Sequence, residues 1–563
     1  MRSKKLIVLY IVLGIAAVFG LTVLVLTSTI WKTGLQVEAQ QVEDTQNITV
    51  NWEATKAVDS VTIQVEHGHS IVYSTTLYNP TDILKGTYTV PVYYGKQQVS
   101  VTIKKALFRK TVTKTVDVFT DEYNIAPIIS TFPVAQFTLS LNDITQNETI
   151  PTFVWFKRGS AWNYSNMLDN VYTIPVASTY EILNYSDKAN IYKKTSAWIK
   201  ELYEMNNNSK FHLYYSDYYA YGWLQATLAN GIPADNYNVV LLSDGTASYK
   251  SFNDHFDTYT FAQEYANMQT KYNKLKEEIT ARSSYTEGNK GFAISAEKVG
   301  EYAFVMAKEE PNVEWWLARI DGTLAPITAN NPQNVITSYV NDLVDAGKIK
   351  KKDLNELLDA MTAEEKQEIK SLYHLSADLF EKAKQENKKI MVILGTTNND
   401  ESHFDEYVNA VKKHYGNGYV YYYKGHPFTP TNSVDGKLKH LQSLGLIDID
   451  STIPAEFIFY FNPEAQITGY GSNTFNSLTD EQTCGIFGVG KEEFSATYKD
   501  NVDLFITKVA QNNETYGSLV SGEDCYLLEF ANIADYEIAI YDNATNKITY
   551  YKLVDGVYKS VKK

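Results

Sequence analysis

The chain has 563 residues, of which 44% are hydrophobic and 21% charged, so it is long enough for about three globular domains. Its net charge of −15 argues against a nucleic-acid partner, which would leave a basic footprint. The two cysteines, Cys484 and Cys525, lack the CxxC or Cys/His spacing of a zinc site. The two cysteines could form one disulfide if the chain is exported, and two unpaired buried thiols explain them equally well.

Residues 1–31 are expected to form an N-terminal membrane anchor. Arg2, Lys4 and Lys5 precede an apolar run from Leu6 to about Leu26, long enough to cross the ~30 Å hydrocarbon core of a bilayer. The basic flank favours a cytoplasmic N-terminus, with the rest of the chain outside the cytoplasm. A cleaved signal peptide is the alternative, although no small-residue cleavage site stands out. The mostly polar residues 32–46 are interpreted as a stalk.

Residues 47–120 are expected to form an immunoglobulin-like β-sandwich. Runs such as "NITVNWEA", "SVTIQVEHG" and "QQVSVTIKKA" alternate apolar and polar residues and are separated by turn residues. No Cys–Trp–Cys pattern is present, so the likeness to immunoglobulins concerns architecture only. The proline-bearing stretch at 121–133, "DEYNIAPIISTFP", is interpreted as a linker.

Beyond residue 133, short apolar runs alternate with segments of helical spacing. The expected strands include "VAQFTLSLN", "PTFVWFKR", "FHLYYSD", "YNVVLLSDG", "IMVILGTT" and "GYVYYYKG". This order favours parallel sheets covered by helices on both faces. Since the pattern is too long for one sheet, we expect two α/β lobes, over 134–385 and 386–563.

Ligands of such sheets bind beyond the carboxyl ends of the strands, which selects the residues found there. Asp244 and Gly245 follow one expected strand, and Asp244 is a candidate general base. A tight Asp-Gly turn explains the same two residues. No GxxxxGK[ST] or GxGxxG motif is present, so the P-loop and dinucleotide fingerprints are excluded.

The run "YVYYYKGHPFTP" ends another expected strand in Lys424, Gly425, His426 and Pro427. A histidine held here by glycine and proline can donate to a phosphate and protonate a leaving group. A structural histidine bonded to a carbonyl and a solvent-facing lysine are the alternatives.

Two further strand ends carry hydroxyl and amide side chains. Ser472 and Asn473 follow "QITGYG" and are typical of an anion site at a helix N-terminus, or of a simple helix cap. Thr396 and Thr397 follow "VILG" in the same way.

In order along the chain, these pieces resemble the bacterial sialyltransferases of glycosyltransferase family 80, the Pasteurella and Photobacterium type. The matching segments are Ser243-Asp244-Gly245, Gly395 to Asn399, Lys424 to Pro427, "IPAEFIFYF" at 453–461 and Gly471-Ser472-Asn473. The resemblance spans about 134–490, and some Photobacterium members also carry an immunoglobulin-like domain.

The resemblance implies a GT-B fold of two Rossmann-like lobes and an inverting transfer that needs no metal or other cofactor. The donor would be a CMP-activated sialic acid, and the acceptor a galactose-type glycan. By the same resemblance, Asp244 is the acceptor-activating base and His426 protonates the departing CMP phosphate. Glu456 holds the donor ribose and Ser472 binds the phosphate. The other implied substrate contacts are Gly245, Thr396, Thr397, Asn399, Lys424, Gly425, Pro427 and Asn473.

Three departures from the family pattern leave other functions open. Ser243 replaces a first aspartate, Asn473 a second serine, and Asn399 an acceptor-side tryptophan. Transfer of another CMP-activated ulosonic acid is one alternative. A catalytically degenerate, extracytoplasmic carbohydrate-binding protein is the other, because bacterial CMP-sugars are made in the cytoplasm.

Overall fold

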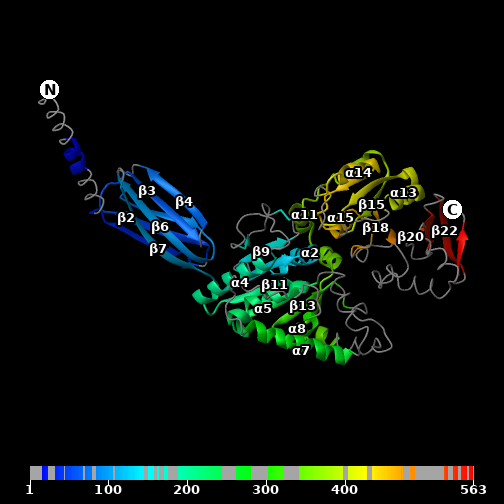
Figure 1. The fold of residues 1–563 in the computed structure, drawn as a ribbon, viewed down its shortest axis with the longest axis horizontal. Helices are drawn as coiled ribbons and strands as arrows, with labels where there is room; N and C mark the ends of the chain where they lie inside the picture. The colour runs from blue at the N-terminus through cyan, green and yellow to red at the C-terminus, as the bar shows by residue number, and fades with distance from the viewer. Residues whose placement is uncertain are drawn as a thin grey trace, which may run out of the picture.

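The computed structural model of the chain contains a β-sandwich followed by two α/β lobes, coloured blue, cyan to green, and yellow to red in Figure 1. The residues it describes are 15–22, 32–43, 45–67, 70–78, 84–105, 108–144, 150–157, 162–163, 170–174, 188–243, 261–280, 302–318, 320, 341–396, 404–427, 431, 434–470, 472, 474, 478, 482–488, 525–530, 537–542, 547–554 and 557–561.

Residues 15–22 form a helix with exposed apolar side chains, among them Val18 and Phe19. Within the described residues, no helix is both long enough and apolar enough to span a membrane. Most of the anchor expected over 1–31 lies outside these residues, and it stays a prediction.

The sandwich consists of two antiparallel sheets. One has the order β1-β2-β5 and the other β4-β3-β6-β7. Alternate residues of each strand point inward, as the period-two pattern requires, and Val50, Ile63 and Val101 are fully buried between the sheets. The strands are β1 (Leu35–Gln41), β2 (Asn47–Ala54), β3 (Ser60–His67), β4 (Ser70–Tyr78), β5 (Lys85–Pro91), β6 (Gly95–Lys105) and β7 (Phe108–Val118).

The interpretation of 32–46 as a stalk is wrong for β1, which pairs with β2 along its whole length. Leu35, Val37 and Ala39 alternate with polar residues, and Val37 is buried in the sandwich core. The abundant glutamines hid this alternation, so the sandwich begins before residue 47.

The first lobe contains a seven-stranded parallel sheet with the order β10-β9-β8-β11-β12-β13-β14. Its strands are β8 (Glu122–Ile129), β9 (Thr152–Lys157), β10 (Val171–Thr173), β11 (Lys210–Ser216), β12 (Tyr237–Leu242), β13 (Val313–Leu317) and β14 (Ile349–Lys351). Helices α2 (Thr131–Leu139), α4 (Lys188–Met205), α5 (Tyr221–Ala226), α7 (Phe261–Thr280) and α8 (Tyr302–Glu309) pack around it.

Two expectations for residues 121–142 are wrong. The expected linker contains β8, the strand from which the sheet extends in both directions. Pro127 is tolerated because the β8–β11 pairing already ends at Ile125, so the missing N–H breaks no further bond. The expected strand "VAQFTLSLN" lies largely in α2, which is buried on nearly all sides and therefore shows no helical alternation.

Helices α10 (Leu354–Ala360), α11 (Ala363–Leu372) and α12 (Glu381–Gln385) follow β14 along the chain. Thr362 and Glu365 form a capping box at the start of α11. Tyr373, just after α11, packs edge-on against Phe457 of the second lobe at 4.7 Å between ring centroids, and its hydroxyl lies 3.0 Å from Thr138 Oγ1 of the first lobe. One apolar core therefore includes residues of both lobes.

The second lobe contains a nine-stranded sheet with the order β17-β16-β15-β18-β19-β20-β21-β22-β23. The first five strands are parallel, and the last four form an antiparallel extension that we did not expect. The elements are β15 (Lys389–Leu394), α13 (Phe404–Tyr415), β16 (Tyr419–Lys424), α14 (Lys437–Ser443), β17 (Ile447–Ile449), α15 (Ala455–Phe461), β18 (Ala465–Tyr470), β19 (Thr483–Gly488), β20 (Cys525–Phe530), β21 (Glu537–Asp542), β22 (Lys547–Val554) and β23 (Val557–Val561).

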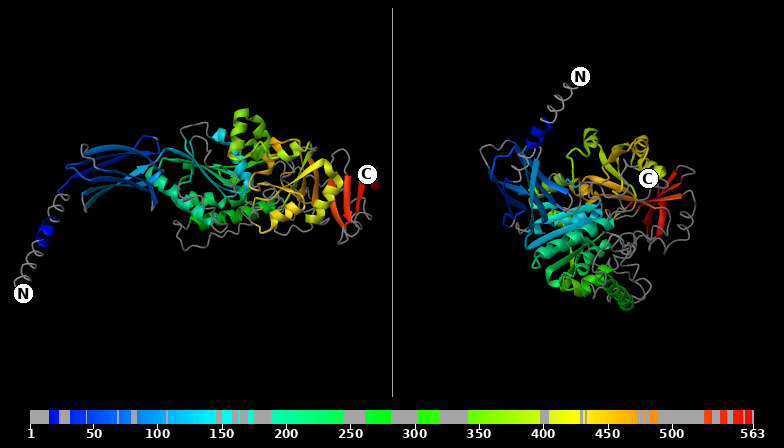
Figure 2. Two further views of the ribbon diagram at one scale, coloured as in Figure 1. Left: turned by 90° about the horizontal axis from the view of Figure 1, so that it is seen from above. Right: turned by 60° about the vertical axis from the view of Figure 1, so that its left-hand side comes forward.

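The parallel strands of both sheets are doubly wound. In each, the chain builds outward on one side of its first strand and then crosses to the other side, so the order reverses between β8 and β11 and between β15 and β18. Such reversal points are where α/β sheets bind ligands. The expectation of two α/β lobes with parallel strands is confirmed by this strand order, and Figure 2 shows the lobes side by side beyond the sandwich.

Candidate functional site

The candidate site lies at the carboxyl ends of β15, β16 and β18. Leu394 pairs with Lys424 on one side and with Gly469 on the other, and Gly395 N donates to Lys424 O at 2.9 Å. This pairing brings together three of the strand ends that the sequence singled out. It places them at the reversal point of the second sheet.

Gly469 allows β18 to approach β15 at this point. Its φ is +131°, and a Cβ there would overlap the backbone N and O of Leu394 and lie 2.8 Å from Leu394 Cα. A side chain is therefore excluded both by backbone conformation and by space.

Lys424 is 3% exposed, which rules out the solvent-facing alternative. Its Nζ donates to the carbonyl oxygens of Gly425 at 2.9 Å and Ser451 at 2.7 Å. Burial lowers the pKa of Lys424 to about 8, and the negative charges of Glu456, Asp450 and Asp448 oppose this shift. The lysine thus holds the turn after β16 against the loop before α15.

Gly425 is buried in that turn, whereas His426 and Pro427 are partly exposed. A Cβ on Gly425 would lie 3.2 Å from Thr431 Oγ1 and 3.4 Å from Ser451 Cβ, so the backbone passes close to both residues. His426 follows directly from this tightly packed backbone and reaches the surface.

Glu456 in the first turn of α15 is linked to the end of β18 by a chain of hydrogen bonds. Thr474 Oγ1 donates to Glu456 Oε1 at 3.1 Å and lies 3.0 Å from Ser472 Oγ, which accepts from Thr474 N at 3.3 Å. Burial of its carboxyl raises the pKa of Glu456, while its own backbone N–H, Thr474 and Lys424 act in the opposite direction. Thr474 had no role of its own in the expected site, although a second hydroxyl two residues after Ser472 was a signal.

Several expected site residues lie outside the described residues: Asp244, Gly245, Thr397, Asn399 and Asn473. Thr396 is described and lies two residues after β15, next to Gly395, whose N–H donates to Lys424 O. Cys484 has a buried free thiol, and burial raises its pKa to about 11; the side chain of Cys525 is not described.

In the first lobe, the strand ends carry polar residues as well. Ser243 N donates to Trp316 O and to Gln136 Oε1, which places the end of β12, one residue before Asp244, beside α2. Asp217 follows β11 and is fully buried, accepting from Trp315 Nε1 at 3.0 Å. Ser130 follows β8 with φ of 95°, a strained value for a residue with a side chain.

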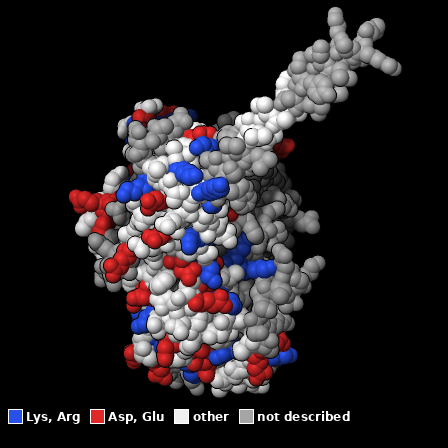
Figure 3. Space-filling model, turned by 90° about the vertical axis from the view of Figure 1, so that its left-hand side faces the viewer, with Lys and Arg blue, Asp and Glu red and all other residues white. Residues whose placement is uncertain are grey.

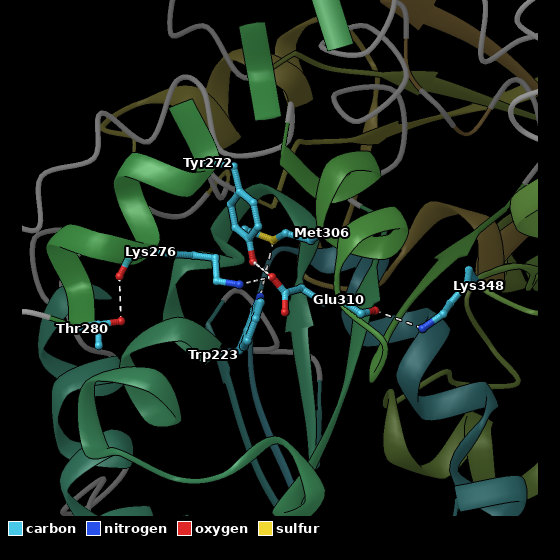
Figure 4. Close-up of polar contacts among 7 residues, drawn as sticks. All are labelled: Trp223, Tyr272, Lys276, Thr280, Met306, Glu310 and Lys348. Carbon is cyan, nitrogen blue, oxygen red and sulfur yellow. Dashed lines mark hydrogen bonds and ion pairs between the residues drawn. The ribbon is translucent and has the colours of Figure 1, made fainter. Parts of the chain in front are cut away.

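A second polar cluster lies near the opposite edge of the first sheet (Figure 4). Glu310, just before β13, accepts from Tyr272 Oη at 2.7 Å and Lys276 Nζ at 2.5 Å, both on α7. Because Glu310 precedes its strand, the cluster joins α7 to the amino end of β13 and lies away from the expected ligand edge. No group of three or more potential metal ligands occurs among the described residues.

Neither family models nor curated protein sequences give a match to the chain. Among solved structures, it is similar to a 2,6-sialyltransferase of Photobacterium sp. JT-ISH-224 in complex with CMP and lactose, at 13% identity over 77% of this chain and 86% of that one, with a TM-score of 0.47. It is also similar to a sialyltransferase of Photobacterium damsela, at 13% identity over 83% and 96%, with a TM-score of 0.48. At these TM-scores the likenesses decide neither fold nor family, and the fold rests on the strand orders given above.

Proposed function

We propose that the chain is a glycosyltransferase that moves a sialic acid from a CMP-activated donor to a sugar hydroxyl. The observation that carries the proposal is the joint placement of the β15, β16 and β18 ends. Around one reversal point, they gather a partly exposed histidine, a glutamate and two hydroxyl side chains. The ordered sequence motifs give this site its proposed ligand.

In the proposed reaction, the acceptor hydroxyl loses its proton to Asp244 as its oxygen attacks the anomeric carbon from the face opposite the phosphate. The bond between that carbon and the CMP phosphate oxygen breaks, and His426 donates a proton to the departing phosphate. Each of these proton transfers contributes ~10²–10⁴-fold to such reactions. Attack from the opposite face inverts the anomeric centre.

The hydrogen-bonded chain supports the donor half of the proposal. A carboxylate only accepts, so the Glu456 oxygens suit ribose hydroxyls, and Thr474 holds one of them in place. Ser472 is partly exposed beside this chain and suits a phosphate oxygen.

The test is CMP release from CMP-N-acetylneuraminic acid with lactose as acceptor. We expect release by the wild type and a loss of ~10²-fold or more in Asp244→Ala, whereas Asp235→Ala, which changes an exposed residue in the turn before β12, releases CMP at the wild-type rate. Release only from another CMP-ulosonic acid would favour that alternative donor. CMP release unchanged by Asp244→Ala would contradict the assigned base.

We also propose that residues 1–31 anchor the protein in a membrane with the lobes outside the cytoplasm. The basic flank and the apolar run support this. The protein should stay in the membrane fraction after alkaline carbonate washing, and deletion of residues 1–31 should release it. A full-length chain that washes off would contradict the anchor.

The described face in Figure 3 carries acidic and basic side chains interspersed, without a large patch of one sign. The charge distribution of this face therefore does not indicate a strongly charged macromolecular partner. The ligands proposed here are CMP-sugars and glycans.

A further inference from the structure

We propose that Lys424 is a positioning residue of the donor site: its buried ammonium group ties the turn that carries His426 to the loop that carries Glu456. The inference rests on the proposed function for the identity of the donor. The tie itself is a feature of the fold that can be measured without the reaction.

The two hydrogen bonds of Lys424 define the tie. One goes to Gly425 O, immediately before His426, and the other to Ser451 O, five residues before Glu456. Both acceptors are main-chain carbonyls in segments that are neither helix nor strand. Hydrogen bonds of regular secondary structure therefore do not satisfy them. A buried carbonyl that loses its donor costs ~1–3 kcal/mol, so the ammonium favours one arrangement of both segments.

Packing around Gly425 shows that the two segments are in contact. Its backbone is held between Thr431 and Ser451, and Thr431 Oγ1 in turn donates to Asp448 Oδ1 of β17 at 2.8 Å. The turn therefore has little space to shift while the Lys424 bonds persist. Removal of the ammonium would free both carbonyls at once.

Electrostatics add a second link between the same groups. The nearby charges of Glu456, Asp450 and Asp448 favour the ammonium form of Lys424, and Lys424 in turn favours ionised Glu456. Asp450 and Asp448 are also held by hydroxyl donors of Thr452 and Thr431. The buried cation thus acts in the same direction as the hydrogen bonds of Glu456, against the rise in the Glu456 pKa that burial causes.

This arrangement gives Lys424 a role different from phosphate binding. Its Nζ is directed to backbone carbonyls and its side chain is buried, so its charge acts through the positions of His426 and Glu456.

The test compares Lys424→Met with Lys439→Met, an exposed lysine of α14 that serves as the control. CMP affinity is measured by calorimetry, and the His426 ring resonances are followed by NMR in histidine-labelled protein, assigned with His426→Asn. We expect Lys424→Met to bind CMP at least ~10-fold more weakly and to shift the His426 resonances even without CMP. Lys439→Met should match the wild type in both measurements.

If Lys424→Met fails to fold, as judged by near-ultraviolet circular dichroism, Lys424→Arg decides the inference. The guanidinium keeps the charge but displaces the donors, so weaker CMP binding and shifted His426 resonances are again expected. A folded variant with wild-type CMP affinity and unchanged His426 resonances would overturn the inference. A wild type that does not bind CMP would instead count against the proposed function, while the His426 resonances still report on the tie.

Discussion

Gly469 of β18 lies against the backbone of Leu394 of β15, at the position where the second sheet reverses its strand order. The Gly469→Ala substitution adds a side chain at φ +131° and forces it onto Leu394. We expect a loss of about 3 kcal/mol or more in the free energy of unfolding, because backbone strain and overpacking act together.

Urea unfolding followed by circular dichroism measures this loss. The control is Gly418→Ala, since a Cβ there meets nothing within 4 Å and the residue needs no left-handed backbone. Gly418→Ala should change stability by no more than ~0.5 kcal/mol. Equal effects of the two substitutions would show that the close approach of β18 to β15 does not matter for stability.

The sandwich and the first lobe should unfold in one transition. Their buried residues form one apolar core, and Trp198 of α4 donates to Tyr94 O of the sandwich at 3.0 Å while its ring packs edge-on against Tyr123 and Phe153. Trp198→Ala should therefore cost about 3–5 kcal/mol and lower the melting of both parts together. In Tyr78→Ala, where the side chain is 78% exposed, calorimetry should show almost no change. A Trp198→Ala protein whose sandwich melts as in the wild type would refute the shared core.

The buried ammonium group of Lys424 should make the free energy of unfolding depend on pH. The unfolded chain keeps this proton up to pH about 10.5, whereas the folded chain loses it near pH 8. Between these values the unfolded state binds more protons, so the free energy of unfolding should rise with pH, by about 3–4 kcal/mol at most. Below pH 8 both states are protonated and this contribution is constant.

The measurement compares the pH profiles of unfolding free energy for the wild type and Lys424→Met. Subtracting one profile from the other removes the contributions of the many tyrosines, which both proteins share. The remaining difference in unfolding free energy should change between about pH 8 and 10.5. Parallel profiles across this range would mean that Lys424 is not buried as a cation.

Glu456→Gln should weaken recognition of the donor ribose specifically. The wild type is expected to prefer CMP over 2′,3′-dideoxy-CMP by ~10-fold or more, since hydrogen bonds to a carboxylate contribute ~1.5–3 kcal/mol. In Glu456→Gln this preference should shrink, and in Glu464→Gln, an exposed residue, it should persist. A preference that survives Glu456→Gln intact would remove Glu456 from the ribose site.

The sequence allowed most of the parallel strands to be predicted, because buried strands such as β12 and β16 are short apolar runs that end in polar or glycine residues. The prediction of secondary structure from the sequence was wrong at β8 and α2. Pro127 suggested a break, yet it lies beyond the point where the β8–β11 pairing ends. Helix α2 is buried on nearly every side, so it lacks the one-sided pattern by which a surface helix is recognised.

The candidate site was predictable only where its residues lie next to an apolar run in the sequence. Strand ends select His426 and Ser472 because they follow apolar runs directly in the sequence. The contacts of Lys424 with Ser451 and of Thr474 with Glu456 join segments 27 and 18 residues apart, and no local pattern encodes them. The assignment of Asp244 stays a prediction.

The most direct test of the account is the rate of CMP release by His426→Asn beside His440→Asn. His440 is an exposed histidine of α14 that pairs with Asp405 at 2.7 Å, so its substitution controls for the loss of any histidine. We predict a kcat lowered ~10²–10⁴-fold in His426→Asn and unchanged in His440→Asn, with CMP still bound by both. Equal CMP release by the two variants would contradict the proposal that His426 protonates the departing phosphate.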